Sequence, residues 1–146
     1  MARSQKDFTY DNATLLKDAG AVTVDGAAQV SAAARVLDLG ANARTDGRVI
    51  VDVSAITTNG ATGEGYTITA QHSASASFAS GVIGSGSIRL GAATAMPGES
   101  AATVAGRYEF HAQTEVNGVL YRYMRLYHDV SGTAPSINYT AFLVKE

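Results

Sequence analysis

The sequence predicts an all-β protein, an antiparallel β-sandwich or jelly roll of about eight strands with an extended N-terminal arm. Short runs of alternating apolar and polar residues recur along the chain, and this alternation is typical of strands with one buried face. Residues that favour turns, chiefly glycine, asparagine, aspartate and proline, separate these runs. The 146 residues fit one ordinary domain.

Residues 1–20 form the predicted arm, and residues 21–146 form the predicted sandwich. The arm is mixed and polar, and a terminal segment of this kind becomes ordered only where something holds it down. Its large apolar side chains are the anchors that we expect to contact a partner: Phe8, Tyr10, Leu15 and Leu16.

The candidate strands follow the arm in a regular series. They are Ala21–Val24, Ala34–Leu39, Arg48–Thr57, Gly65–His72, Val82–Leu90, Ala102–Ala112, Val119–Val130 and Ser136–Val144. Between two of these runs lies Asn117-Gly118, which is the strongest hairpin signal in the chain because both residues accept a positive φ. Ala27–Val36 is rich in alanine and leaves a helix open as an alternative, although it lacks an apolar stripe of helical period.

Alternation assigns the faces of the two clearest strands. The apolar face of the first is predicted to carry Val49, Val51, Val53 and Ala55, opposite Arg48, Ile50, Asp52 and Ser54. In the second, Tyr66, Ile68 and Ala70 oppose Thr67, Thr69 and Gln71. One polar and one apolar face per strand is typical of antiparallel sheets.

Composition argues against several classes of partner and chemistry. A formal net charge of −2 and a pI near 5.9 provide no general attraction to nucleic acid. No run approaches the roughly 18 apolar residues that would indicate a membrane span. Without cysteine the chain has no disulfide, thiolate metal site or cysteine nucleophile. We therefore expect neither nucleic acid nor a membrane as a partner.

The sequence shows no pattern of catalytic or metal-binding type. His72, His111 and His128 lie in three separate runs without ligand-type spacing, and we interpret them as strand-edge histidines. Carboxylates are single, and Gly84–Ser87 lacks the spacing of a nucleophile elbow. The glycine-rich segment Gly60–Gly65 leads into a strand instead of a helix, unlike a phosphate loop. We predict a protein without catalytic, cofactor-binding or metal-binding residues.

The run from Leu120 to Val130 is the most distinctive segment. On strand geometry one face carries Leu120, Arg122, Met124, Leu126, His128 and Val130, and the other carries Tyr121, Tyr123, Arg125, Tyr127 and Asp129. Tyrosine and arginine are enriched in protein interfaces. The tyrosine face therefore either binds a partner or lines the core with the other face outward. Stacking of nucleic-acid bases on the tyrosines would need a basic groove, which the charge balance disfavours.

In the order and spacing of several segments, the chain resembles the jelly-roll cement, or decoration, proteins of tailed bacteriophage capsids. These segments are Leu15–Thr23, Val36–Gly40, Ile68–Ser73 followed by Phe78, Tyr121–Leu126, Val130–Thr133 and Thr140–Val144. They span most of the chain. The run Ser73–Ser77 departs from the family, whose members often place an acidic residue in this turn.

The resemblance implies a β-sandwich protomer that assembles as a homotrimer on the outer surface of the virion capsid, after synthesis in the host cytoplasm. Its partner would be the major capsid protein, at the places where capsomers meet, and it would need no cofactor. We expect two contact surfaces: the arm with Phe8, Tyr10, Leu15 and Leu16, and the strand with Tyr121, Tyr123, Arg125 and Tyr127.

Two other functions remain open at this point. The chain could be another β-module of a virion, such as a tail, tail-fibre or head-fibre domain that binds a receptor. A β-sandwich hydrolase or carbohydrate-binding module is the alternative from a different class, and it would need a metal site or an essential histidine such as His72 or His111.

Overall fold

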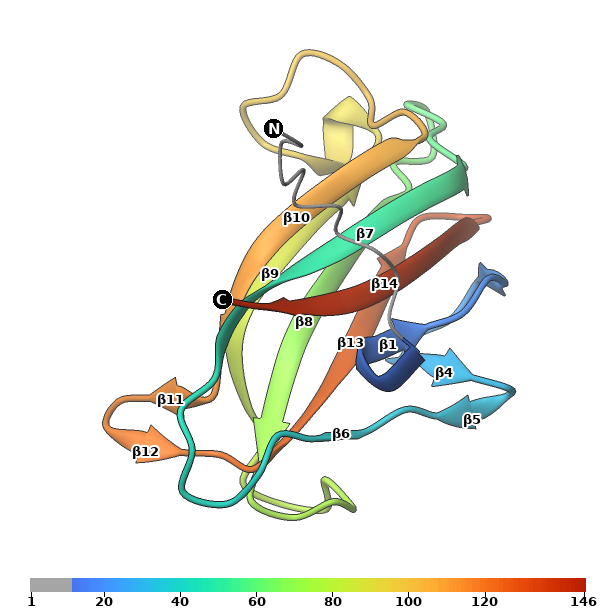
Figure 1. Cartoon of the computed structure of the whole chain (residues 1–146). Helices are drawn as coiled ribbons and strands as arrows, with labels where there is room; N and C mark the ends of the chain where they lie inside the picture. The colour runs from blue at the N-terminus through green and yellow to red at the C-terminus, as the bar shows by residue number, and fades with distance from the viewer. Residues whose placement is uncertain (1–11) are drawn as a thin grey trace, which may run out of the picture.

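The computed structural model describes residues 12–146, which fold into two antiparallel five-stranded sheets packed face to face (Figure 1). The predicted β-sandwich is therefore confirmed. The structure contains more strands than predicted, because several short strands border the six long ones. Phe8 and Tyr10 lie outside the described residues.

The two sheets take up alternating parts of the chain. Sheet A has the order β1 (Leu15–Lys17), β14 (Ile137–Lys145), β7 (Asp46–Ile56) and β10 (Gly106–Gln113), and β2 (Ala21–Val22) also pairs with β14. Sheet B has the order β3 (Gly26–Ala27), β13 (Tyr123–Ser131), β8 (Gly65–Ser73) and β9 (Ile83–Gly91), and β6 (Leu37–Asp38) also pairs with β13. Two small hairpins are formed by β4 (Gln29–Val30) with β5 (Ala33–Ala34) and by β11 (Glu115–Val116) with β12 (Val119–Leu120). Short 3-10 helices span Asn12–Thr14 and Ala93–Ala95.

The core lies between the sheets and follows the predicted alternation. Its largest contributors from the long strands are Val49, Val51, Val53, Tyr66, Ile68, Met124, Leu126, Tyr139 and Leu143. The prediction for Ala55 was wrong: a bulge opposite Asn138 and Tyr139 shifts the register of β7, so Ala55 is exposed and Ile56 turns towards the core.

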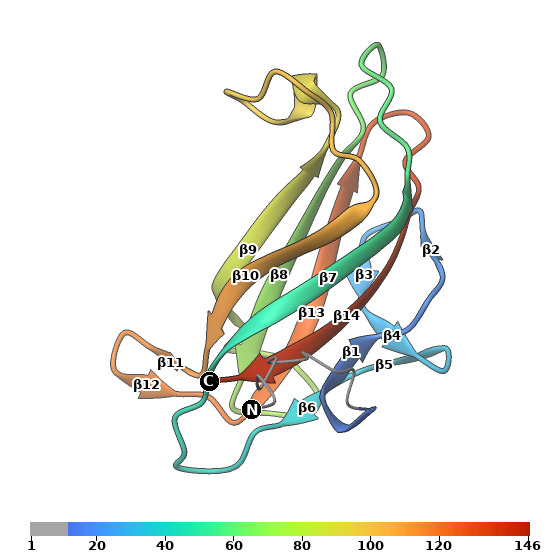
Figure 2. The same cartoon turned by 45° about the horizontal axis from the view of Figure 1, so that its top comes forward.

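The sandwich is closed along the edge where β9 and β10 lie side by side (Figures 1 and 2). Here the N–H of Gln113 donates to the Ser85 hydroxyl oxygen at 3.2 Å. A Cβ on Gly86 would collide with the backbone oxygen of His111, so only glycine allows β9 and β10 to approach this closely.

The sheet begins within the range predicted as an arm. Leu15 and Leu16 belong to β1, which pairs with β14, and they are 2% and 0% exposed. Leu16 points into the core, whereas Leu15 lies beside Phe142 in sheet A. The two leucines are thus part of the folded domain and cannot serve as exposed anchors.

Residues 27–36 form strands instead of the alternative helix. Ser31 and Ala32 adopt φ values of 53° and 63° between β4 and β5, which is the two-residue hairpin turn with both φ values positive. The predicted hairpin at Asn117-Gly118 is confirmed, with φ values of 52° and 78° between β11 and β12. The predicted strand Val119–Val130 is divided, since β12 ends at Leu120 and β13 begins at Tyr123.

Candidate functional site

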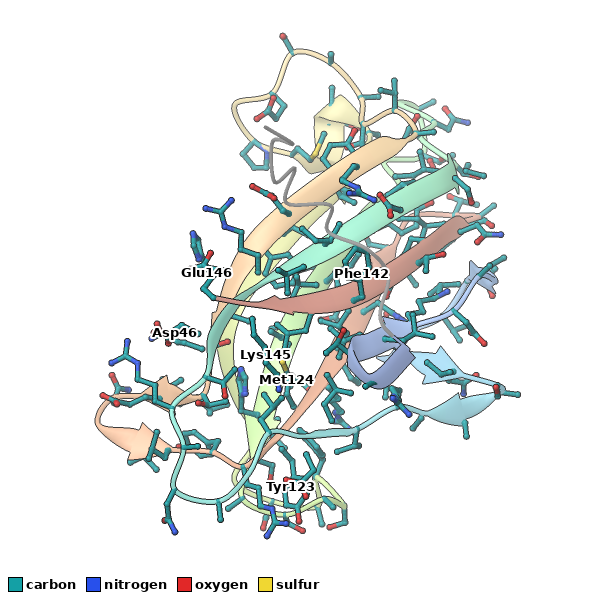
Figure 3. The ribbon with its side chains drawn as sticks, in the orientation of Figure 1. Asp46, Tyr123, Met124, Phe142, Lys145 and Glu146 are labelled. Atoms are coloured by element: carbon teal, nitrogen blue, oxygen red, sulfur yellow. The ribbon has the colours of Figure 1, made fainter. Side chains whose placement is uncertain are left out.

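The outer face of β13 carries the interface residues that the sequence predicted. Met124, Leu126 and His128 are buried towards the core, and the alternate residues Tyr123, Arg125 and Tyr127 are half-buried on the outer face of sheet B. Figure 3 shows Tyr123 and Met124 on the two sides of the strand. The alternative in which the tyrosines line the core is therefore wrong.

Arg125 is held at the centre of this face. Its Nε donates to Oε1 of Gln71, the residue opposite it on β8, at 2.9 Å. Its guanidinium carbon lies 4.4 Å from the centroid of the Phe78 ring and 5.6 Å from that of Tyr127. We call Tyr123, Arg125 and Tyr127, together with Gln71 and Phe78, the tyrosine–arginine face.

Phe78 is the residue of this face that sequence reasoning did not select as a site residue. It follows β8 in a run of serine and alanine, and its N–H donates to Ser75 O at 3.1 Å. Its φ of 52° turns the chain back so that the ring lies under Arg125. A single aromatic residue in a run of small residues was the available signal, because such a ring needs a partner to be buried.

The arginines of the described chain include paired and unpaired ones. Four arginines pair with carboxylates: Arg44 with Asp46, Arg48 with Glu109 and Glu146, Arg107 with Asp52, and Arg122 with Asp38. Within residues 12–146, neither Arg125 nor Arg89 has a carboxylate partner. Both belong to long strands of sheet B, and Arg89 lies opposite Thr67 on β8. Sheet A also holds cations without a carboxylate within ion-pair distance, Lys17 and Lys145, so the distinguishing feature of Arg125 is its fixed position on the outer face.

Tyr121 and Arg122 lie outside β13, so the predicted alternation does not extend to them. The Tyr121 N–H donates to Thr114 O at 2.8 Å at the base of the β11–β12 hairpin. The Arg122 guanidinium makes two hydrogen bonds of 2.8 Å to the Asp38 carboxylate. These bonds, helped by the Gly40 N–H, lower the pKa of Asp38 to about 2. Tyr121 is therefore not assigned to the tyrosine–arginine face.

The predicted strand-edge position was wrong for two of the three histidines, His72 and His128. They are 0% and 6% exposed at core-facing positions of β8 and β13, and only His111 is exposed. Burial lowers the pKa of each to about 4, with a further contribution at His128 from the charge of Lys17. Both imidazoles are neutral at neutral pH.

His72 and Ser85 are the residue types that serve as general base and nucleophile in many hydrolases. His72 Nε2 lies 2.6 Å from Ser85 Oγ, and the other ring nitrogen, Nδ1, is buried without a partner. The small void beside His72, lined by Ala112 and Met124, has no room for a water molecule. A catalytic serine needs an oriented base and space for a substrate, and this pair has neither.

Within residues 12–146 no three acidic or histidine side chains cluster in a way that could hold a metal ion. No helix in this part of the chain is long and apolar enough to cross a bilayer. Comparisons with protein-family models, with curated proteins and with solved structures gave no match.

Proposed function

We propose that the protein is a non-catalytic cement protein that binds the outer surface of a tailed-phage capsid between capsomers and stabilises the shell. One observation carries this proposal. The Arg125 guanidinium is half-buried and held in place on the outer face of sheet B, and it has no carboxylate partner among the described residues. Tyrosine and arginine are among the residues that most often dominate the binding energy of protein interfaces. The resemblance to cement proteins supplies the identity of the partner.

The geometry of Arg125 favours a carboxylate on the capsid protein. Nε is occupied by Gln71, and the rings of Phe78 and Tyr127 fix the plane of the guanidinium. The two terminal nitrogens remain available for a paired contact, the arrangement in which arginine binds a carboxylate most strongly. Because the side chain is already ordered, binding costs little additional conformational entropy.

The homotrimer is predicted from the resemblance to cement proteins. A symmetric oligomer presents several copies of one modest face to a symmetric shell, so weak contacts act together. Sedimentation velocity of the purified protein tests this directly. A trimer at micromolar concentration agrees with the proposal, and a monomer at all concentrations would remove the trimer from it.

Arg125→Ala is the variant that tests the contact surface. We expect its affinity for expanded capsids of the encoding phage, prepared without the cement protein, to fall at least about tenfold, because a desolvated interfacial charge pair is costly to break. Occupancy on the capsids is measured by quantitative gel densitometry over a concentration series. Arg107→Ala is the matched control, since Arg107 is an exposed arginine on sheet A that is already paired with Asp52.

Two further variants test the guanidinium group and the N-terminal residues: Arg125→Lys and a truncated chain. Lysine keeps the charge and loses the planar fork, so its occupancy should lie between those of the wild type and Arg125→Ala. Deletion of residues 1–11 leaves β1 intact and tests the contribution of Phe8 and Tyr10. Equal occupancy of the wild type and Arg125→Ala, with both proteins folded, would remove the tyrosine–arginine face from the mechanism.

A further inference from the structure

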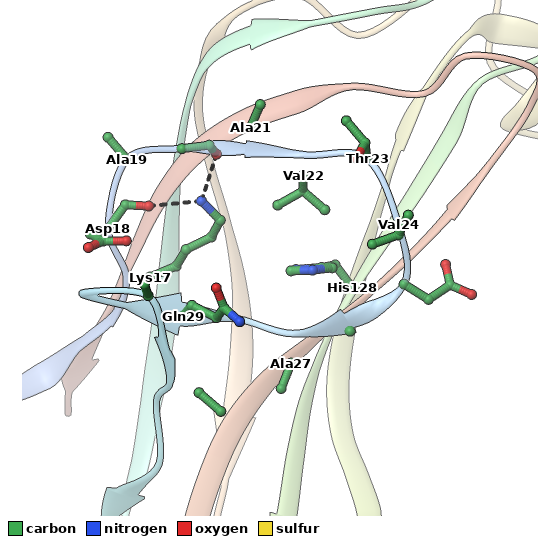
Figure 4. A pocket seen from close by; sticks show the side chains of 15 residues that line it. Lys17, Asp18, Ala19, Ala21, Val22, Thr23, Val24, Ala27, Gln29 and His128 are labelled. Atoms are coloured by element: carbon green, nitrogen blue, oxygen red, sulfur yellow. Dashed lines mark hydrogen bonds between the residues drawn. The ribbon is translucent and has the colours of Figure 1, made fainter.

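A cavity of about 500 Å³ lies at the edge of the sandwich opposite the β9–β10 contact. At this edge β2 belongs to sheet A and β3 to sheet B, and the chain from Lys17 to Gln29 passes between the two sheets. The segment closes into a ring because the Asp18 N–H donates to Gln29 O at 3.2 Å. Figure 4 shows this ring around the cavity.

Small residues line most of the cavity, and two of its polar side chains are buried. Ala19, Ala21, Ala27, Ala32 and Ala34 are among the small residues that line it. Lys17 and His128, which are 4% and 6% exposed, lie at the bottom with Val22. Ligand sites commonly combine such walls with a few fixed polar groups, and their volumes run from about 300 to 1,000 Å³.

Lys17 brings a positive charge that no described carboxylate neutralises by direct contact. Its ammonium group donates to the carbonyl oxygens of Asp18, Gly20 and Tyr139 at 2.8, 2.9 and 2.9 Å. Within residues 12–146 no carboxylate lies within ion-pair distance of it. Asp18 and Asp25 also line the cavity, and their carboxylates accept the backbone N–H groups of Ser31 and Val130. Burial lowers the pKa of Lys17, and the charge of Asp18 partly opposes this shift. The three carbonyl oxygens accept hydrogen bonds from the ammonium group but do not cancel its positive charge.

His128 offers one hydrogen-bonding nitrogen to the cavity. Its Nδ1 lies 3.0 Å from the Tyr139 hydroxyl, and burial raises the pKa of that hydroxyl, which therefore keeps its proton. If the hydroxyl donates to Nδ1, the imidazole proton sits on Nε2. The opposite arrangement would leave the buried Tyr139 hydroxyl without an acceptor among the described residues, which is costly. We therefore assign the proton to Nε2, which has no partner within residues 12–146.

We propose that this cavity binds a carboxylate group, which accepts a hydrogen bond from His128 Nε2 and is attracted by the charge of Lys17. A small organic acid and an aspartate or glutamate side chain of a partner protein share this chemistry. The proposal does not rest on the cement function. His128 lies on the core side of β13, whereas the tyrosine–arginine face is on its outer side, and Ala27 of the cavity pairs with Tyr127 of that face.

Gly26→Ala is the variant that blocks the site with the least disturbance. A Cβ at this position would lie 3.9 Å from His128 Nε2, an ordinary van der Waals distance, and would meet nothing closer. The added methyl shields Nε2 from a ligand while the fold is kept. Gly106→Ala is the matched control, because a Cβ there enters open space far from the cavity.

The test is an NMR titration of the full chain with sodium acetate at pH 7, against sodium chloride at equal ionic strength. We expect saturable shifts of the His128 ring and Val22 signals, unchanged His111 signals, and at least a fivefold loss of acetate affinity in Gly26→Ala. Gly106→Ala should behave like the wild type. Thermal unfolding of each variant confirms that it is folded.

A blocked pentapeptide with a central glutamate distinguishes the two sources of carboxylate. Tighter binding of the peptide than of acetate identifies a protein side chain as the ligand, and binding of acetate alone identifies a small acid. The proposal is overturned if neither probe gives a saturable shift up to about 100 mM, or if Gly26→Ala leaves the shifts unchanged. Arg125→Ala is titrated with acetate in parallel, and unchanged acetate binding by this variant separates the cavity from the proposed capsid contact.

Discussion

At the scale of single residues, the imidazoles of His72 and His128 lie in the core, where burial lowers the pKa of each to about 4. In the unfolded chain a histidine has a pKa of about 6.5. Below that value the unfolded state binds protons that the folded state does not bind. The free energy of unfolding therefore decreases as pH falls from about 6.5 to about 4.

We expect the two histidines together to make the protein markedly less stable at pH 4.5 than at pH 7, since each shift corresponds to as much as ~3 kcal/mol. Urea unfolding at a series of pH values measures this change. His72→Gln should reduce the slope, because one of the two buried titrating groups is removed. His111→Gln is the control on an exposed histidine and should leave the slope unchanged. A free energy of unfolding that stays constant between pH 7 and 4.5 would contradict the burial of both rings.

Residue-scale prediction from sequence worked where alternation decides the outcome. The outward positions of Tyr123, Arg125 and Tyr127 follow from strand geometry alone. The contact of Arg125 with Phe78 could not be predicted, because it depends on a loop conformation and on the pairing of β8 with β13. The burial of His72 was missed because the residue was interpreted as the end of a run, whereas β8 continues to Ser73.

At the scale of elements, the β4–β5 hairpin turns at two residues that are not glycine. Ala32 has a φ of 63°, a conformation that costs an L-residue about 1 kcal/mol. Ala32→Gly should therefore stabilise the protein by up to about 1 kcal/mol, measured by urea unfolding. Ala34→Gly, in the adjacent strand β5, should destabilise it by about 0.5 to 1 kcal/mol. A loss of stability in Ala32→Gly would mean that the turn differs from the one described.

The closed edge of the sandwich depends on Gly86. Gly86→Ala should reduce the free energy of unfolding by ~2 kcal/mol or more, because the new methyl group would collide with the backbone of β10 and separate it from β9. Gly106→Ala removes another strand glycine where a Cβ meets open space, and it should be nearly neutral. Equal effects of the two substitutions would show that the close approach of β9 and β10 is not important for stability.

The long strands were predictable, and the short ones were not, for the same physical reason. A run such as β7 or β8 contains enough residues for its alternation to be recognised, whereas β2, β3 and β6 contain two residues each. Those short strands exist because β13 and β14 offer free edges near the N-terminal part of the chain. Pairing of this kind is decided by tertiary packing and leaves almost no pattern in the sequence.

At the scale of the whole molecule, the two sheets present different outer faces. On sheet A the exposed arginines pair with carboxylates, as Arg48 does with Glu109 and Arg107 with Asp52. Sheet B exposes tyrosines and arginines that lack carboxylate partners within residues 12–146. The ordered, unpaired Arg125 between aromatic rings is the feature that favours this face, and it leads to the proposal that sheet B faces the capsid.

The most direct measurement is a cryo-electron microscopy map of expanded capsids saturated with the protein. The proposed function predicts density for a β-sandwich on the outer surface between capsomers, with β13 facing the shell and a capsid carboxylate at Arg125. Density in a tail or head fibre, or a sandwich that contacts the shell through sheet A, would contradict it.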